Sequence, residues 1–171
     1  MQAWFGFYAV IGGASATLLG LLFVAVSINA AVTLGAGHGG SKRLAEQAFQ
    51  NYLAVMMVSL LALFPGMKTS TFGLAAICLT AVWAIWVLVR LYSEFARPTD
   101  DEYRVFALRR HLSSLIGFGI LVATALRMAM NIADDRNLLA GATIILLFSA
   151  TQTSWELLNR IAQTKHEQSS N

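Results

Sequence analysis

A set of polar side chains recurs at helical spacing in and beside the apolar stretch 112–133. Steps of three and four residues place them on one helix face, together with Gly117 and Ile120. The polar members are Ser113, Thr124, Arg127, Asn131 and Asp134. Such a stripe can line an ion path or a binding site, because polar residues inside spanning helices face protein or a water-filled cavity.

Arg127 is the charged residue that lies well inside this stretch. A charge at the centre of a bilayer costs at least about 2.5 kcal/mol on insertion scales, so the guanidinium must find compensation. Three interpretations remain open. Arg127 is a structural residue satisfied by backbone carbonyls and Asn131, a pore or binding-site residue, or a side chain that extends to the membrane surface.

Other kinds of chemistry have little support in the sequence. The three histidines, His38, His111 and His166, fall at the ends of the apolar stretches or beyond them. Cys78 is the single cysteine, so a cysteine metal cluster is not expected within one chain. Zinc-protease, phosphate-loop and nucleophile-elbow motifs are absent from the sequence. We therefore expect no enzyme activity, no catalytic residue, no metal and no cofactor.

The composition places the chain among membrane proteins. Of its 171 residues, 57% are hydrophobic and 12% are charged, and the mean hydropathy is +0.61; soluble domains carry about 25% charged residues. A spanning helix needs about 20 mostly apolar residues, so we predict an all-α bundle of five transmembrane helices. The predicted spans cover about 4–33, 50–66, 72–92, 112–133 and 138–158.

The rest of the chain forms connections within a single transmembrane domain over residues 1–160. Residues 99–111 follow Pro98 and begin with a capping-box pattern, so we expect an interfacial helix on the cytoplasmic side there. Residues 161–171 are expected to form a polar cytoplasmic tail. Span 50–66 is the weakest, and the alternative is a bundle of four spans plus an interfacial helix.

The distribution of basic residues predicts how the helices run through the membrane. Of the 12 Lys and Arg residues, Arg127 lies inside a span, Lys68 and Arg136 fall on one side, and the other nine fall on the opposite side. The side rich in basic residues is cytoplasmic, which places the N-terminus outside and the C-terminus inside. The basic residues of the interfacial helix, which suit anionic lipid headgroups, are Arg104, Arg109 and Arg110. Apart from these basic residues, no feature of the sequence supports nucleic-acid binding.

A stripe of small residues runs along the first predicted span. Its members recur every three or four residues, apart from a larger step at the end, and are Gly6, Ala9, Gly13, Ala16, Gly20 and Ser27. Lipid supplies no hydrophobic drive between helices, so small residues favour association by allowing two backbones to approach closely. The stripe is either a packing face within the same subunit or a subunit interface or pore wall in a homo-oligomer.

A second polar layer is expected near the cytoplasmic ends of the spans. It consists of Asn29, Gln152 and Glu156. Glu156 lies four residues before Arg160, which is the spacing of an ion pair on one helix face. We therefore predict a solvated pair between these two side chains.

The string ATLLGLLFVAVSIN, from Ala16 to Asn29, resembles the first helix of a widespread group of small bacterial multi-spanning membrane proteins. Members of that group are sometimes labelled modulators of the FtsH membrane protease. The resemblance covers roughly one helix. It implies a multi-pass protein of the bacterial inner membrane and transfers no functional residues.

Two functional hypotheses follow from these patterns. The polar stripe with Arg127 and the small-residue stripe favour a homo-oligomeric ion channel or small transport protein in the lipid bilayer. The alternative is a non-catalytic accessory or regulatory subunit that binds other membrane proteins, for example a membrane-protease modulator. Five helices in 171 residues leave little room for a soluble domain, which suits the alternative equally well.

Overall fold

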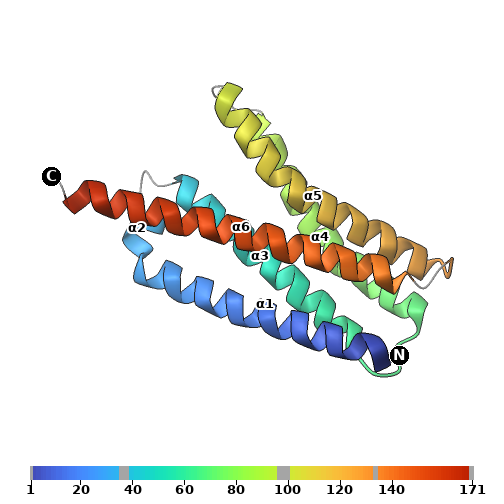
Figure 1. Cartoon of the computed structure of the whole chain (residues 1–171). Helices are drawn as coiled ribbons and strands as arrows, with labels where there is room; N and C mark the ends of the chain where they lie inside the picture. Colours follow the sequence, from blue (N-terminus) through green and yellow to red (C-terminus); the bar gives the residue numbers. More distant parts are fainter. Residues whose placement is uncertain (1, 35–38, 96–100, 133–134, 170–171) are drawn as a thin grey trace.

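The computed structural model describes residues 2–34, 39–95, 101–132 and 135–169, and the regular structure in these ranges is α-helical (Figure 1). In chain order the helices are α1 (Gln2–Ile28), α2 (Ala30–Leu34), α3 (Gly39–Ala62), α4 (Thr69–Phe95), α5 (Asp101–Ala129) and α6 (Arg136–Ser169). Helix α2 has five residues, and the others have 24 to 34. The prediction of an all-α fold is confirmed.

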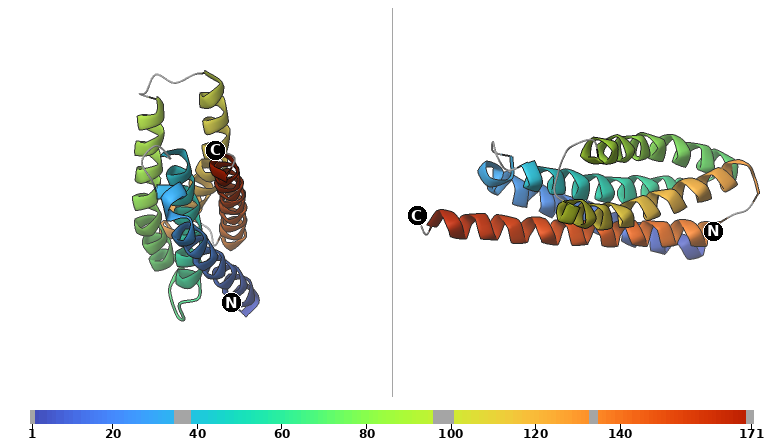
Figure 2. Two further views of the ribbon diagram at one scale, coloured as in Figure 1. Left: turned by 90° about the vertical axis from the view of Figure 1, so that its left-hand side faces the viewer. Right: turned by 90° about the horizontal axis from the view of Figure 1, so that it is seen from above.

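The long helices form one elongated bundle with α3 at its centre (Figure 1, Figure 2). Helix α3 contacts α1, α4 and α6, and α5 contacts α4 and α6. The start of α1, the α3–α4 turn and the start of α6 lie together at one end, which we call the N-terminal end. Helix α2 and the last turns of α6 lie at the opposite, C-terminal end.

The buried residues include two apolar clusters, but many large apolar side chains also lie on the surface, and several polar ones are buried. Large apolar residues cover the outside of the helices, where Val10 is 70% exposed, Val82 68% and Phe148 62%. The buried polar residues include Ser15, Gln47, Asn51, Ser59, Thr80, Ser114, Thr124, Thr143, Ser149 and Thr153. Soluble monomers rarely expose so much contiguous apolar surface, whereas membrane helices pack through small and polar residues and leave large apolar ones outside.

Two of the described helices are long and apolar enough to cross a membrane. These segments are Trp4–Ile28 in α1 and Arg136–Thr164 in α6, and shorter apolar segments cover Thr69–Trp83 and Ser114–Ala129. By length and composition, the described residues therefore favour membrane association.

Asn29 divides the apolar run that was predicted as one span over residues 4–33. Its backbone N–H and its Nδ2 atom both reach the carbonyl oxygen of Ala25, at 3.3 and 2.8 Å. An asparagine side chain that competes for backbone groups in this way weakens the regular helical ladder. Thr33 N of α2 then donates to Asn29 O at 2.9 Å.

Two helices continue through segments that the sequence predicts as separate elements. Residues 101–111, expected to form the interfacial helix, run without a break into the rest of α5; residues 99 and 100 lie outside the described part of the chain. Residues 161–169 of the expected polar tail continue α6. That tail is rich in strong helix formers such as Ala, Gln, Lys and Glu, so the helix extends beyond its apolar part.

Helices α4 and α5 approach each other closely at Gly73. A Cβ atom at this position would meet the backbone of α5, at Ala129 N and at a distance of 2.6 Å from Ala125 O. Backbone atoms cannot rotate out of the way as a flexible side chain can. The separation of the two helices therefore depends on a residue without a side chain at position 73.

We predict that Gly73→Ala forces α4 away from α5 and lowers the free energy of unfolding by about 3 kcal/mol, the upper part of the range for overpacking. Unfolding in detergent followed by circular dichroism measures this loss. Gly119→Ala on α5 is the matched control, because a Cβ there meets no atom within 4 Å. It should be neutral or stabilise by up to about 1 kcal/mol. Wild-type stability in Gly73→Ala would contradict the close approach.

Candidate functional site

The centre of the bundle holds a cluster of hydrogen-bonded side chains, which we call the polar core. It consists of Gln47 and Asn51 of α3, Ser114 of α5 and Ser149 of α6. Asn51 Nδ2 donates to Ser114 Oγ at 2.8 Å and lies 3.4 Å from Ser149 Oγ. The two serine hydroxyls are 2.9 Å apart, so a single amide of α3 joins α5 to α6.

The local sequence explains why these side chains meet. Gln47 and Asn51 are four residues apart and therefore share one face of α3. Gln47 Nε2 adds a third bond to Ser114 Oγ, at 3.3 Å. Their partners are serines, whose small side chains let the backbones of α5 and α6 come close.

The polar core is enclosed by protein. Asn51, Ser114 and Ser149 are each 1% exposed, and Ser149 lies about 20 Å along α6 from its first residue, at about 1.5 Å per residue. Within the described part of the chain, Gln47 Oε1 is buried and has no hydrogen-bond partner. The core is thus well satisfied except for one acceptor.

Tyr52 forms a second polar contact between α3 and α6. Its Oη donates to Thr151 Oγ1 at 3.3 Å and lies 3.4 Å from Ser154 Oγ. Thr151 and Ser154 also donate to backbone carbonyls of their own helix, each at 2.9 Å. Polar side chains from two successive positions of α3 therefore hold it against α6.

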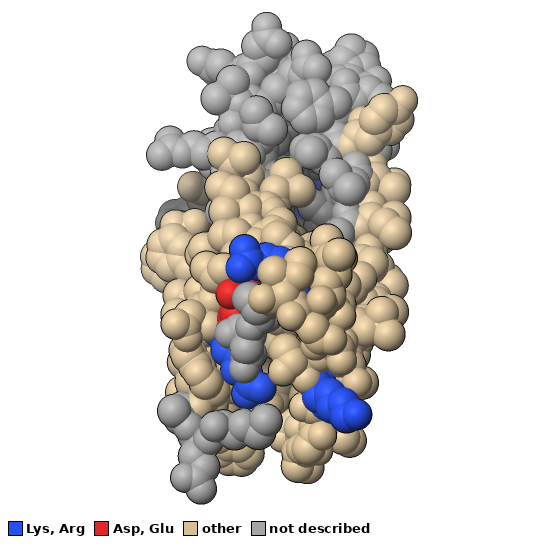
Figure 3. Space-filling view, turned by 90° about the vertical axis from the view of Figure 1, so that its right-hand side faces the viewer, with Lys and Arg blue, Asp and Glu red and all other residues tan. Residues whose placement is uncertain are grey.

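Arg127 forms an ion pair at the N-terminal end of the bundle. Its Nε atom lies 2.6 Å from Asp135 Oδ2, and the two side chains are 52% and 18% exposed. Asp135 directly precedes α6, so the pair ties the end of α5 to the start of α6. Figure 3 views this end and shows basic and acidic atoms close together, with a further basic patch apart from them. The Asp135 carboxylate therefore compensates the charge of Arg127. None of the three interpretations drawn from the sequence proposed a carboxylate partner.

Thr124 has a structural role within α5, and Asn131 has one just after its end. Thr124 is buried and donates to Ile120 O of its own helix at 2.7 Å. Asn131 has a φ of 53° and closes the helix. Its N–H bonds to Met128 O at 3.1 Å, and the next N–H bonds to Arg127 O at 3.0 Å, which is the Schellman pattern. Asparagine tolerates this left-handed conformation better than most residues.

Several predicted site residues lie outside the part of the chain whose side chains the structure describes. They are Ser113 and Asp134 of the polar stripe, and Arg104, Arg109 and Arg110 of the predicted lipid-headgroup site. The described members of the stripe point in different directions, since Thr124 is buried and Arg127 and Asn131 are exposed. Arg127, Thr124 and Asn131 therefore do not line one common surface.

The predicted inner polar layer is found only in part. Arg160 Nη2 donates to Glu156 Oε1 at 3.0 Å, which confirms the ion pair expected from their spacing. Gln152 is exposed on α6. Asn29 bonds to its own helix at the break between α1 and α2, and its Oδ1 is buried without a partner among the described residues.

The small-residue stripe of α1 lies on the outside of the bundle. All of its members are exposed, namely Gly6, Ala9, Gly13, Ala16, Gly20 and Ser27. A Cβ added at any of its three glycines would meet no atom within 4 Å. Helix α1 instead buries Tyr8, Ser15 and Leu22, which lie on the opposite side of the helix. The interpretation of the stripe as a packing face within the same subunit is therefore wrong.

No protein-family model, no curated protein and no solved structure matches this chain. The likeness of residues 16–29 to one group of bacterial membrane proteins stays a prediction from a single helix. A functional proposal therefore has to stand on the geometry of the chain itself.

Neither the polar core nor the partner of Arg127 was predicted from the sequence. The helical spacing of Gln47 and Asn51 is the signal that pointed to a polar face on α3; Asn51 lies at the start of the weakest predicted span, 50–66, and Gln47 just before it. The stripe pattern singled out Asp134, whereas the carboxylate that meets the guanidinium belongs to the next residue, Asp135. Residues that follow a helix end do not keep its periodicity, so spacing could not identify this partner.

We predict that Asn51→Ala lowers the free energy of unfolding by about 2 kcal/mol, because it leaves Ser114 and Ser149 with fewer partners in a site that water does not reach. Thermal unfolding in detergent is the measurement. Gln152→Ala is the control, since this polar residue of α6 is exposed and should change stability by less than about 0.5 kcal/mol. Equal losses in the two variants would show that the polar core does not hold the helices together.

Proposed function

We propose that the protein is a multi-spanning membrane protein that acts as a non-catalytic subunit of a membrane assembly, and that α1 contacts the neighbouring subunit. The observation that carries this proposal is the outward position of the small-residue stripe on α1. A face of this kind gives little apolar bulk to lipid but allows a second helix to approach closely.

Exposed apolar side chains support a path through the membrane for all five long helices. Leu60 of α3, Leu74 of α4 and Ile116 of α5 are 54%, 60% and 47% exposed. Helix α3 is less apolar than α1, but it lies at the centre of the bundle and meets mainly protein. A central helix can carry Gln47 and Asn51 without exposing them to lipid.

The charge distribution and the resemblance of the first helix support the proposed location and direction. The nine basic residues of one side would be cytoplasmic, so the N-terminus would be outside and the C-terminus inside. The two termini lie at opposite ends of the bundle (Figure 1), as an odd number of spans requires. The likeness of residues 16–29 to small bacterial proteins supports the bacterial inner membrane.

Two of the described helices, α1 and α6, are long and apolar enough to cross a membrane, and α1 is the less buried of the two. In its most apolar part, 17% of the residues are buried by the rest of the chain, against 44% in α6. Its main contact is with α3, through the face that holds Tyr8 and Leu22. A neighbouring helix would therefore meet the opposite face without disturbing the contacts of the chain itself.

A homo-oligomeric channel or small transport protein is the second candidate. The observation that favours it is the buried polar core with its remaining acceptor, Gln47 Oε1, because polar residues deep in a membrane often mark a transport path. However, Arg127 is paired with Asp135, and the side chains of the polar core bond to one another. Because these polar groups are engaged within the chain, they favour the subunit role over the channel. Solute release from liposomes that contain the protein distinguishes a conducting assembly from a closed one.

Cysteine cross-linking in native membranes tests the proposal. With Cys78 replaced by serine, we expect Ala16→Cys to cross-link to a neighbour, because this position lies in the middle of the exposed stripe. A product of twice 18.5 kDa identifies a second copy, and another mass identifies a different membrane protein. Adding Gly13→Leu should remove the product, since a large side chain separates the backbones.

The control positions lie on the same helix but off the stripe. Leu21 is 61% exposed, and Leu21→Cys should cross-link much less than Ala16→Cys. Leu21→Phe is the control for Gly13→Leu. Added to Ala16→Cys, it increases the bulk of an exposed position off the stripe and should leave the cross-linked product unchanged. Cross-linking that is absent at Ala16, or equal at both positions, would refute an α1 interface.

A further inference from the structure

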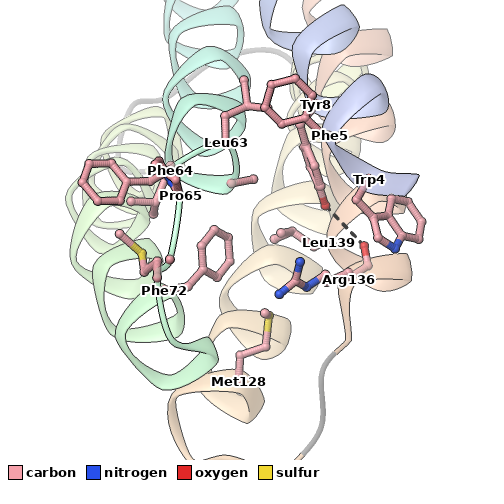
Figure 4. A pocket seen from close by; sticks show the side chains of 14 residues that line it. Trp4, Phe5, Tyr8, Leu63, Phe64, Pro65, Phe72, Met128, Arg136 and Leu139 are labelled. Atoms are coloured by element: carbon pink, nitrogen blue, oxygen red, sulfur yellow. Dashed lines mark hydrogen bonds between the residues drawn. The ribbon is translucent and has the colours of Figure 1, made fainter. Parts of the chain in front are cut away.

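The bundle has a concavity in each of its two halves. The one at the N-terminal end has a volume of about 160 Å³ and lies among apolar and aromatic side chains such as Trp4 and Phe72 (Figure 4). Polar groups of its wall interact within the chain, since Tyr8 Oη donates to Arg136 O at 3.3 Å and neither residue is without a partner. The second concavity, of about 210 Å³, is a groove between α1 and α3, which we call the α1–α3 groove.

The α1–α3 groove is mostly apolar. It is lined by Leu22, Phe23 and Val26 of α1 and by Lys42, Ala45, Glu46, Phe49 and Gln50 of α3. On α3 these positions recur at the spacing of one helix face. Leu22 and Ala45 are buried and form the floor, whereas Phe23 and Phe49 are exposed at the rim. The groove therefore offers an apolar surface between two helices.

Lys42 supplies a positive charge at one end of this surface. Its side chain is exposed, and its ammonium has no ion pair or hydrogen bond in the described part of the chain. Glu46 lines the groove one turn further along α3, but it already has an interaction within the chain. The ammonium of Lys42 is therefore the charge in the groove that is available to a ligand.

In the proposed orientation, the groove runs from the cytoplasmic membrane surface toward the middle of the bilayer. Helix α3 begins at the C-terminal end of the bundle (Figure 1), and that end is cytoplasmic if the basic residues set the direction. Phe49 lies roughly 10 Å deeper along α3 than Lys42, at about 1.5 Å per residue. The charge thus lies toward the headgroups and the apolar surface lies beside the lipid chains, which is the order of these two parts in a phospholipid.

We propose that the α1–α3 groove binds one anionic phospholipid of the cytoplasmic leaflet, with its phosphate at Lys42 and an acyl chain along Leu22 and Ala45. Lysine binds phosphate as a point charge, and basic residues near this surface attract anionic lipids. A zwitterionic lipid would carry its own cation beside the phosphate, and a free phosphate ion would leave the apolar surface uncovered.

This inference rests on the proposed membrane location and direction. It does not rest on the contact of α1 with a neighbouring subunit, because no member of the small-residue stripe lines the groove.

Photo-cross-linking with two lipid probes is the direct test. Nanodiscs of phosphatidylcholine contain the wild-type chain and a trace of either phosphatidylglycerol or phosphatidylcholine, each with the same diazirine-bearing acyl chain. Mass spectrometry measures labelling at Phe23 and Phe49 relative to Phe148, an exposed residue of α6 outside the groove. We expect the phosphatidylglycerol probe to label the groove about fivefold more than the other probe, which corresponds to about 1 kcal/mol for one basic residue near the surface. Both probes should label Phe148 equally.

Two pairs of variants locate the site. Lys42→Gln should abolish the preference for phosphatidylglycerol, whereas Lys68→Gln, which removes the same charge from the turn after α3 at the opposite end of the bundle, should retain it. Val26→Phe narrows the groove and should remove the excess labelling at Phe49. Val24→Phe, at an exposed position of the same helix off the groove, should leave that labelling unchanged. Size-exclusion chromatography and circular dichroism establish that each variant is folded.

The comparison of the two probes uses the wild-type chain alone, so it decides the question even if a variant fails to fold. Equal labelling of the groove by both probes, or a preference that persists in folded Lys42→Gln, would overturn the proposal. Labelling of Phe148 in that case would show that the chain still lies in lipid, so that only the groove proposal fails. Absence of labelling at Phe148 as well as in the groove would overturn the membrane location too. The cross-linking of Ala16→Cys is a separate measurement of the α1 interface.

Discussion

The hydrogen bonds from Asn51 to Ser114 and Ser149 are the interaction on which the bundle most depends. They join the central helix to α5 and α6 at a depth where water does not enter. In the proposed membrane location, lipid supplies no hydrophobic drive between helices, so close packing and interhelical hydrogen bonds would hold them together. The other contacts of α3 extend the same principle, with Tyr52 reaching α6 and α1 packing along the remaining face.

This internal arrangement determines what the outer surfaces can do. Asn51, Ser114, Ser149 and Tyr52 form contacts between the chain's own helices, and Arg127 is paired with Asp135. Two features are left without a role in the fold. One is the exposed small-residue stripe of α1, and the other is the aromatic cavity beside Arg136. The stripe is the surface on which the proposed contact with a neighbouring helix rests.

The sequence predicted the class of structure and some local contacts well. Composition and apolar runs predicted the helical bundle, and the spacing of Glu156 and Arg160 predicted their ion pair. Periodicity also identified the small residues of α1 as one face. It could not say which way that face turns, because in a membrane protein both the inner and the outer face of a helix can be apolar.

The remaining errors share a physical cause. Contacts such as Asn51 to Ser114 join residues 63 positions apart, and no pattern within one helix specifies them. Arg127 meets a residue beyond the end of its helix, where the chain reverses after Asn131. The break at Asn29 was hidden inside an apolar run, because a single asparagine changes the hydrogen bonding of the backbone while hardly changing the average hydropathy.

The central claim is that the outer apolar surface of every long helix contacts lipid. Spin-label accessibility measures this contact most directly. Nitroxide labels at Leu60, Val82 and Ile116, introduced singly with Cys78 replaced by serine, report on α3, α4 and α5 in reconstituted membranes. Five spans predict that each label collides with oxygen, which concentrates in lipid, far more often than with a water-soluble nickel complex. Preferential access of the nickel complex to any of the three would place that helix outside the membrane and contradict the account.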